Sequence, residues 1–261
     1  MSVGARIREA VLRQLDASRT TLRILDAACG DGELSLALHS RGHDVWGIDV
    51  RNTLSPAGAD VLGHRFHLGD LNRGIPFPDR SFDVVICVEG IEHLENVFLF
   101  AAEAFRVCRP GGLVLVTTPN VCSIRSRMRY FGSGFYTQDP RPLDERRRDP
   151  LHHVNLRTFW EWRYVFHVSG FDLTRLAHTH VKPVSWLYGV FAPWIALYTA
   201  IAFRKGCACR RRLNAAVARA LLSRAVLFGE NIVMSYSRPA GAQNRDGPGA
   251  MARLNDCRRA N

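Results

Sequence analysis

The sequence predicts an α/β fold in which a mainly parallel sheet carries helices on both faces. Three observations lead to this prediction. Short apolar segments with strand character alternate with helical segments from residue 24 to about residue 119, an order that implies right-handed crossovers between parallel strands. The first of these strands ends in a turn that contains glycines. The chain of 261 residues is 47% hydrophobic, so it can bury one sizeable core, and one domain with appendages is expected.

The first predicted element is a lead-in helix. Residues 5–17 place Ile7, Val11 and Leu15 on one face, at helical spacing. The helix is basic and amphipathic, unlike the apolar stretch of a secretory signal.

A nucleoside site is predicted where the first strand ends. The strand beginning at Ile24 runs into the glycine-containing segment 26–33, and a second strand, Asp44–Ile48, ends at Asp49. Glycines let the backbone approach a ligand where a side chain would collide, and the helix that follows presents unpaired N–H groups. A carboxylate about 20 residues further along can accept hydrogen bonds from both ribose hydroxyls.

The ligand of this turn is predicted not to be a pyrophosphate. Dinucleotide-binding turns have a third glycine for close packing of helix on strand, but Leu34 and Ser35 stand in its place. The carboxylates of Asp26 and Asp31 flank the glycines and would repel phosphate groups. A cationic ligand suits this acidic turn better.

The segment Asp26–Gly32 resembles the first motif of the class I S-adenosylmethionine-dependent methyltransferases, D-x-G-x-G-x-G in full or D-x-x-C-G-x-G when degraded. The sulfonium and ammonium groups of that cofactor suit an acidic turn. Asp49 then matches the family's ribose-binding acid. Gly69–Leu71, after a third strand predicted at Arg65–Leu68, matches the segment that contacts adenine. The resemblance implies a Rossmann-like sheet of seven strands and S-adenosylmethionine as cofactor. It assigns cofactor binding to Asp26, Ala27, Ala28, Cys29, Gly30, Gly32, Asp49, Val50, Gly69, Asp70, Leu71 and Glu89.

Further motifs of this family follow in order. Pro76–Ile86 resembles the family's run into strand four, and Glu89–Leu94 stands where many members carry E-x-L-E-H. Arg109–Gly112 resembles the junction between a helix and strand five, which is predicted at Leu113–Thr117. The resemblance covers residues 24–119 and continues more weakly to Phe171.

Two elements complete the predicted core. Thr158 is the predicted N-cap of a helix, and Gly170–Asp172 ends that helix and begins strand six. Residues 230–238 are predicted to be the last strand, inserted antiparallel beside strand five, as the family resemblance implies.

The stretch 120–151 is basic and aromatic and is predicted to hold a short helix followed by a proline-bounded loop. In the family this region covers the substrate. Arg125–Tyr136 therefore either face an anionic or sugar-like acceptor or form an ordinary solvated surface.

Histidines are the candidates for catalysis. Transfer of a methyl group to a hydroxyl requires removal of a proton, and imidazole titrates near neutral pH. His93 and His153 are predicted to be catalytic, with His152 as a third candidate and a capping or core role as the alternative. Glu89, Glu92 and His93 also resemble a cluster that is associated with a divalent cation in ubiquinone-pathway O-methyltransferases. We predict no metal site, and a divalent cation remains the alternative.

The second unusual feature is an apolar segment. Residues 183–203 carry no charge, and arginines and a lysine follow at once. This pattern is typical of a membrane span. A single crossing would, however, place the last strand on the wrong side of the bilayer. We therefore predict an insertion between strands six and seven, a bent helix or helical hairpin in the cytoplasmic leaflet. Residues 183–212 would meet anionic lipid, and the aromatic side chains that would lie near the headgroups are Trp186, Tyr188, Trp194 and Tyr198.

A second helix is predicted at Arg210–Leu227, with Leu213 and Leu221 on its apolar side. A buried lid, a dimer surface and a true span are the alternatives for the whole insertion.

Charge is unevenly distributed. The net charge is +11, and residues 204–261 hold 12 basic and 3 acidic side chains, so the rest of the chain is nearly neutral. The chain lacks a recognisable RNA-binding module, and no nucleic-acid partner is predicted. Seven cysteines without a secretory signal indicate reduced thiols and a cytoplasmic location, and Cys207 and Cys209 are interpreted as incidental thiols.

These observations predict a methyltransferase that acts on oxygen in a small-molecule, glycan or lipid-linked acceptor, peripheral to the inner membrane face. A membrane-associated protein that binds S-adenosylmethionine without turnover is the alternative, and an RNA methyltransferase is a further one. The predicted organisation is an N-terminal helix (1–21), a cofactor-binding core (22–182), an apolar and basic helical insertion (183–229), the last core strand (230–238) and a disordered tail (239–261).

Overall fold

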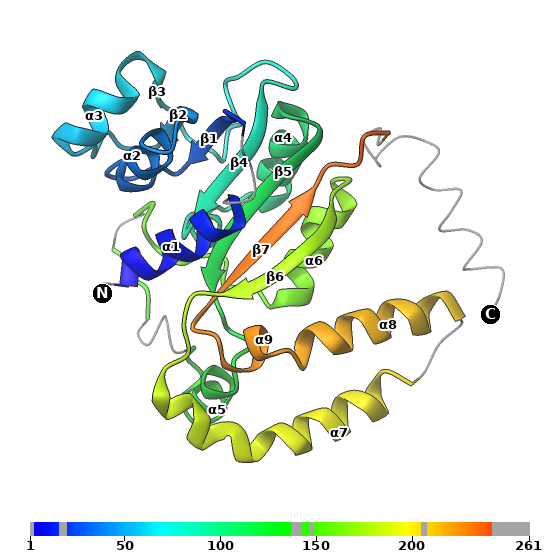
Figure 1. Cartoon of the computed structure of the whole chain (residues 1–261). Helices are drawn as coiled ribbons and strands as arrows, with labels where there is room; N and C mark the ends of the chain where they lie inside the picture. The colour runs from blue at the N-terminus through cyan, green and yellow to red at the C-terminus, as the bar shows by residue number, and fades with distance from the viewer. Residues whose placement is uncertain (1–2, 16–19, 137–141, 147–148, 205–207, 242–261) are drawn as a thin grey trace.

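The computed structural model describes residues 3–15, 20–136, 142–146, 149–204 and 208–241. Within these residues, seven strands form one sheet in the order β3-β2-β1-β4-β5-β7-β6 (Figure 1). The strands are β1 (Arg23–Ala27), β2 (Asp44–Asp49), β3 (Phe66–Leu68), β4 (Phe82–Val88), β5 (Cys108–Pro119), β6 (Asp172–His178) and β7 (Asn231–Ser237). The helices are α1 (Val3–Leu15), α2 (Glu33–His39), α3 (Pro56–Leu62), α4 (Val97–Val107), α5 (Ile124–Ser133), α6 (Phe159–Val168), α7 (Ala192–Ala202), α8 (Ala208–Leu221) and α9 (Arg224–Phe228). Short 3₁₀ helices are η1 (Gly63–Arg65), η2 (Ile91–His93) and η3 (Pro183–Phe191).

The predicted fold class is confirmed. β1 to β5 pair in parallel, and β7 runs antiparallel between β5 and β6. In Figure 1, β7 is the orange arrow that points against its green neighbours. Because β6 is also antiparallel to β7, its carboxyl end lies at the same edge of the sheet as the carboxyl ends of β1, β2, β4 and β5.

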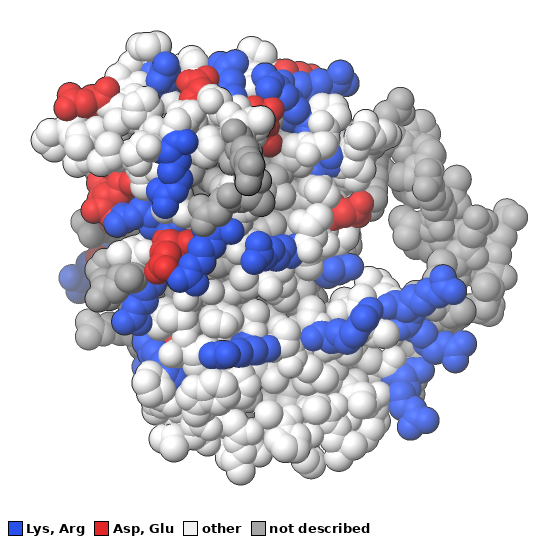
Figure 2. All heavy atoms as spheres, viewed as in Figure 1, with Lys and Arg blue, Asp and Glu red and all other residues white. Residues whose placement is uncertain are grey.

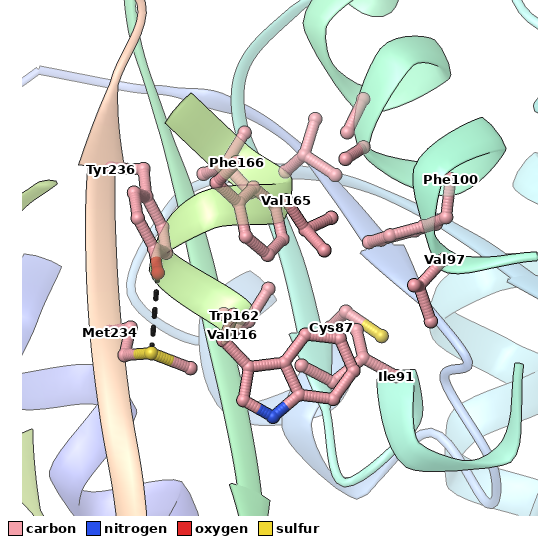
Figure 3. Packing of buried hydrophobic residues seen from close by; sticks show 14 of the residues in the cluster. Cys87, Ile91, Val97, Phe100, Val116, Trp162, Val165, Phe166, Met234 and Tyr236 are labelled. Carbon is pink, nitrogen blue, oxygen red and sulfur yellow. Dashed lines mark hydrogen bonds between the residues drawn. The ribbon is translucent and has the colours of Figure 1, made fainter. Parts of the chain in front are cut away.

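Alternation along the strands creates a core on each face. Leu25 of β1 faces the larger cluster, which includes α4 and α6, while the preceding residue, Ile24, faces the cluster that includes α1 and α2. Figure 3 shows the larger cluster, where Trp162 and Phe166 of α6 pack beside the sheet and Phe166 stacks on Tyr236 with ring centroids 4.4 Å apart. Helices therefore cover both faces, as the alternating sequence predicts.

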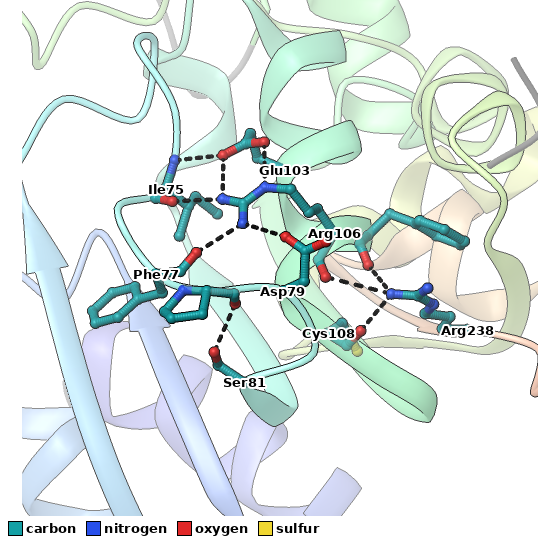
Figure 4. Close-up of polar contacts among 10 residues, drawn as sticks. Ile75, Phe77, Asp79, Ser81, Glu103, Arg106, Cys108 and Arg238 are labelled. Carbon is teal, nitrogen blue, oxygen red and sulfur yellow. Dashed lines mark hydrogen bonds and ion pairs between the residues drawn. The ribbon is translucent and has the colours of Figure 1, made fainter. Parts of the chain in front are cut away.

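The amino edge of the sheet is held by two arginines (Figure 4). Arg106 at the end of α4 donates to Glu103 and to the carbonyls of Ile75 and Phe77, and so ties down the loop before β4. Arg238 after β7 is buried and donates to the carbonyl of Cys108. These contacts lie away from the carboxyl edge, where the candidate site is.

Two predicted strand boundaries are wrong. The predicted junction Arg109–Gly112 lies inside β5, which begins at Cys108. A register shift against β4 accommodates these extra residues, and a side chain at position 112 would meet the Asp83 carbonyl at 2.7 Å, so glycine is required there. Strand three begins at Phe66 because Arg65 closes η1.

The predicted insertion between strands six and seven is an assembly of η3, α7, α8 and α9. The predicted second helix at Arg210–Leu227 is wrong as one element, because the chain breaks after Leu221 and the Ser223 hydroxyl caps α9 by accepting from the Val226 N–H. Leu213 is 52% exposed and does not lie on a buried face.

Among the described residues, one helical stretch, Pro183–Ala202, is long and apolar enough to cross a membrane, and only 11% of its apolar window is buried. Side chains of Cys207 and Cys209 and the predicted tail from residue 242 onward lie outside the described part of the chain.

Candidate active site at the carboxyl edge

The residues predicted to bind the cofactor meet at the carboxyl ends of β1, β2, β3 and β4. Ala27 pairs with Ile48, and Asp49 pairs with Leu68, so three strand ends lie side by side. The N–H of Gly69 donates to the Asp49 carbonyl, which joins the third loop to the second. The topology thus gathers segments that are 20 or more residues apart.

The turn after β1 is built for close approach. Gly30 and Gly32 have φ of +56° and +80°, which glycine adopts without strain, and Ala28 has φ of +64°. A side chain at Gly32 would meet the backbone of Gly58 at 2.9 Å, whereas one at Gly30 would meet no atom of the described residues within 4 Å. The two glycines therefore differ: Gly32 packs against α3, and Gly30 borders open space where a ligand can lie.

Asp49 is held against this turn by backbone donors. Its Oδ2 accepts from the Gly30 N–H at 2.9 Å, and its Oδ1 accepts from the Arg51 N–H at 3.0 Å. Val50, beside it, is exposed. The carboxylate is fixed at the open side of the turn and keeps further lone pairs available for hydroxyl groups.

Asp70 lies at the end of the third loop. Its Oδ1 accepts from the Asn72 N–H at 2.9 Å, and Arg73 lies 3.7 Å away as an ion-pair partner. Leu71 is buried and anchors the loop in the larger core cluster. Asp70 thus stands at the same edge as Asp49, on a loop fixed by its own backbone.

Asp26 differs from these two carboxylates because it is buried. Burial raises its pKa to about 6, against the effect of the Ser35 hydroxyl, which donates to its Oδ2 at 2.7 Å; the negative charges of Asp49 and Asp31 raise the pKa further. The same burial and carboxylates raise the pKa of the Cys29 thiol, which is therefore protonated and unreactive. The turn carries a negative potential that favours a cationic ligand.

Glu89 stands on the strained first residue after β4, with φ of +48°. The Thr117 hydroxyl donates to its Oε1 at 2.7 Å, and the Asn231 side-chain amide donates to its Oε2. Burial raises its pKa to about 7. No signal in the sequence indicates that Asn231 contacts Glu89, because the two residues are 142 positions apart in the chain.

The two histidines predicted to be catalytic lie together. The rings of His93 and His153 have centroids 4.8 Å apart, and His93 Nδ1 lies 3.1 Å from the His152 carbonyl oxygen. Since a carbonyl only accepts, Nδ1 carries the proton and Nε2 is left as an acceptor. Burial lowers the pKa of His93. His93 is therefore a neutral imidazole with a basic nitrogen at pH 7.

Glu92 is fully buried beside them, and within the described part of the chain neither of its carboxylate oxygens has a hydrogen-bond partner of good geometry, although the nearby Thr118 hydroxyl lowers its pKa. Burial, followed by the charge of Glu89, raises its pKa well above the usual range. Ligand atoms of Glu92, His93 and His153 all lie within 4.8 Å of one another and could hold a cation. Glu89 does not belong to this group, because Thr117 and Asn231 hold it elsewhere.

A cavity of about 530 Å³ lies at the opposite edge of the sheet, between Leu15, Leu22, Asp83 and Gly112. The predicted site residues do not line it. Parallel sheets bind ligands beyond the carboxyl ends of their strands, so the carboxyl edge is the candidate site.

Comparison with known proteins agrees with this geometry. Residues 25–116, from β1 into β5, match the methyltransferase domain family. A ubiquinone biosynthesis O-methyltransferase from Rickettsia conorii is 31% identical over 115 residues, which is 43% of this chain and 40% of that relative's length. This chain thus spans about two fifths of that relative.

Solved structures share the fold over most of the chain. An S-adenosylmethionine-dependent methyltransferase from Archaeoglobus fulgidus aligns with a TM-score of 0.54 at 14% identity, covering 88% of this chain and 92% of that one. The [4+2]-cyclase SpnF aligns with a TM-score of 0.52 at 20% identity, covering 90% of this chain and 81% of that one. Residues 25–116 thus form a domain that matches the methyltransferase family, and this match, the relatives and the fold support a class I S-adenosylmethionine-dependent methyltransferase with S-adenosylmethionine as its cofactor.

Proposed function

We propose that this chain transfers a methyl group from S-adenosylmethionine to an oxygen atom of a small-molecule, glycan or lipid-linked acceptor at the cytoplasmic membrane face. The observation that carries the proposal is the open turn at Gly30, with the Asp49 carboxylate fixed beside it by two backbone N–H groups. A side chain at position 30 would occupy this open space, so the residues present fit the cofactor.

Each cofactor residue then has a role. Asp49 accepts hydrogen bonds from the ribose hydroxyls, and Asp70 accepts one from the adenine amino group. Asp26, Ala27, Ala28 and Cys29 form the floor of the turn, and its negative potential attracts the cationic methionine end. Glu89, fixed by Thr117 and Asn231, faces that same end. The bound cofactor supplies an electrophilic methyl group on a good leaving group, and the protein's task is to align the acceptor.

His93 is the proposed general base. Its Nδ1–H donates to the His152 carbonyl, which orients Nε2 for an acceptor hydroxyl, and its lowered pKa keeps it neutral at pH 7. His153, in ring contact, lines the same side. An acceptor hydroxyl would lose its proton to His93 Nε2 as its oxygen is methylated and the methyl carbon separates from its sulfonium leaving group.

The apolar arm, defined as η3 and α7, supports location at a membrane surface. Its side chains are exposed: Leu187 is 76%, Val190 74% and Trp194 69% accessible. Figure 2 shows the lower face of the molecule free of charge, with a band of Lys and Arg side chains above it. An apolar face bordered by cations is typical of proteins that bind the interface of an anionic bilayer.

The arm does not favour two of the alternatives, the membrane span and the buried lid. Both ends of the insertion join the same sheet, at β6 and β7, so a span would require α8 to cross back with Arg211, Arg212 and Arg219 in the bilayer. A buried lid would hide the apolar side chains, which are exposed. The arm is therefore proposed to lie flat in the leaflet.

Binding without turnover is the second candidate function, and one observation favours keeping it. SpnF has this fold, and its name is that of a cyclase, so the fold alone does not establish methyl transfer. Methylated product from a turnover assay would decide between the two.

The central experiment is titration calorimetry with S-adenosylhomocysteine. Asp49→Ala is expected to weaken binding by about 1.5–3 kcal/mol, through loss of charge-assisted hydrogen bonds. Asp44→Ala removes a carboxylate from the other end of β2 and is the matched control, with unchanged affinity expected. Absence of binding by the unmodified chain would refute the proposal, and an unchanged affinity for Asp49→Ala would show that Asp49 is not the ribose acid.

A further inference from the structure

Two cations converge on one carboxylate beyond the ends of β6 and β7. Arg125 Nη2 and Lys182 Nζ both contact Oε1 of Glu230, the lysine at 3.0 Å. The Glu230 side chain is only 5% exposed, whereas the Lys182 side chain is 44% exposed. The carboxylate thus holds two positive groups in place, and one of them reaches the surface.

The surroundings of this pair are positive. The pKa of His180 is lowered by burial and by the charges of Arg6, Lys182 and Arg125, and Glu230 is the carboxylate that opposes them. Next to it, burial and the charge of Arg224 lower the pKa of His178. Since α1, α5, α9 and the N-cap of η3 each contribute a cation, Glu230 alone does not neutralise the described part of this region.

This region adjoins the methyl-transfer site. Glu230 donates its N–H to the His180 carbonyl, and its own carbonyl accepts from the Asn120 N–H. The next residue, Asn231, donates to Glu89. Asp26, Asp49, Asp70 and Glu89 thus lie at the ends of β1 to β4, whereas Arg125 and Lys182 lie beyond the ends of β5 and β6.

An apolar surface begins beside the cations. Lys182 directly precedes η3, and η3 packs against α5, the helix that carries Arg125. Trp186 of η3 stacks on Phe228 of α9, with ring centroids 4.8 Å apart, while Leu187 and Val190 stay exposed. In Figure 1, η3 and α5 lie together beyond the carboxyl end of β5, and the rest of the apolar arm extends away from them.

We propose that Arg125 and Lys182, held by Glu230, bind a phosphate-type group of an amphiphilic acceptor whose apolar chain runs along η3. This inference rests on the proposed function, which it deepens by naming the acceptor class. Arginine and lysine together can donate to several oxygens of one phosphate. The carboxylates around the cofactor turn repel the same group, so the acceptor can enter in one orientation only.

The test uses decyl phosphate, below its micelle concentration, and the full chain. Lys182→Ala is expected to weaken binding roughly tenfold, because a cation is lost while Arg125 still pairs with Glu230. Glu230→Gln is expected to tighten binding of decyl phosphate, because the Glu230 carboxylate no longer competes with the phosphate for Arg125 and Lys182, while glutamine keeps the shape of the side chain. If Glu230 only stabilises the fold, Glu230→Gln should instead weaken binding, in proportion to the stability that the variant loses.

Arg219→Ala removes an exposed cation from α8 and is the matched control, with unchanged affinity expected. Inorganic phosphate should bind much more weakly than decyl phosphate, and Leu187→Ser should reduce only the affinity for the alkyl compound. Equal weakening by Arg219→Ala, weaker binding by Glu230→Gln, or equal affinity for inorganic and decyl phosphate would overturn the proposal. Binding of S-adenosylhomocysteine, measured in the same samples, distinguishes the proposed function from the proposed phosphate subsite. If the unmodified chain does not bind S-adenosylhomocysteine, the proposed function is wrong, whereas the phosphate subsite is tested by decyl phosphate alone.

Discussion

The carboxylates of the cofactor turn illustrate how surroundings divide the roles of identical side chains. Asp49 is fixed by backbone N–H groups at the open side of the turn, whereas Asp26 is buried with one hydroxyl donor. The sequence placed both in one motif. Only the structure shows that Asp49 lies at the open side of the turn, whereas Asp26 is buried at a cost in stability.

That cost can be measured with Asp26→Asn. The folded pKa of about 6 lies above the reference value of 3.8, so the unfolded chain loses its proton first and stability falls as pH rises between these values. The full cost is present above pH 6 and amounts to roughly 2–3 kcal/mol. We expect Asp26→Asn to raise the free energy of unfolding in urea, with a gain about twice as large at pH 7.5 as at pH 5.

Asp60→Asn on the exposed surface of α3 is the control, with no pH-dependent gain expected. A gain that does not vary with pH would show that the Asp26 carboxyl does not titrate in this range. S-adenosylhomocysteine should bind Asp26→Asn more weakly, since the mutation removes negative potential from the turn.

His93 gives a second prediction at the residue scale. A base acts only when deprotonated, and burial puts the pKa of His93 below 6.5. At saturating S-adenosylmethionine, where protonation of Glu89 near pH 7 does not limit cofactor binding, kcat should therefore stay level from pH 8 to below 6.5 and fall only at lower pH. His93→Gln should lower kcat by roughly 10²–10⁴-fold and leave affinity for S-adenosylhomocysteine unchanged. A normal kcat for this variant, or an inflection above pH 6.5 that persists in it, would assign the proton transfer to another group.

At the scale of elements, local sequence patterns such as helix caps predicted where α6 begins, whereas contacts between distant segments left no pattern in the sequence. Thr158 was predicted to cap a helix, and the structure shows a full capping box with Glu161 at the start of α6. The break between α8 and α9 was missed. Ser223, the N-cap of α9, is a local signal for this break, whereas the packing of α9 at the end of β5 depends on residues outside 210–227.

Asn120 joins these elements and gives the third prediction. Its side-chain amide, which is buried, donates to the carbonyls of Val226 and Gly229 at 2.9 and 2.8 Å and thereby fixes α9 to the end of β5. Asn120→Ala should cost about 1–3 kcal/mol of stability, because buried carbonyls lose their donor. Hydrogen exchange should quicken at Val226 and Leu227 while the amides of α2 keep their protection, and uniform quickening would contradict this local role.

At the scale of the whole molecule, the charge and the apolar surface are segregated. The apolar arm forms one uncharged face, with basic side chains bordering it in Figure 2. The carboxyl edge opens beside the arm, since η3 begins next to Lys182. An acceptor drawn from a membrane would therefore reach the site without leaving the surface.

Flotation with vesicles tests this arrangement. The chain should float with phosphatidylglycerol vesicles and much less with phosphatidylcholine, because both apolar burial and cation attraction contribute. Leu197→Ser with Ile201→Ser on α7 should reduce partitioning by roughly tenfold or more, since each exposed side chain contributes about 1.5–3 kcal/mol when buried. The same change at Leu151 and Val154, which are exposed elsewhere, is the control, and equal loss in both would exclude the arm as the membrane-binding face.

The sequence alone determined the order of strands and helices, the glycine turn, and the carboxylates at the strand ends, because these depend on short-range periodicity and backbone conformation. Only the tertiary structure brought Asn231 to Glu89, and Arg125 and Lys182 to Glu230. The partners in these contacts are 48 to 142 residues apart and meet because β7 inserts between β5 and β6. The cofactor turn could thus be predicted from local residues, whereas the acceptor side was decided by the topology of the sheet.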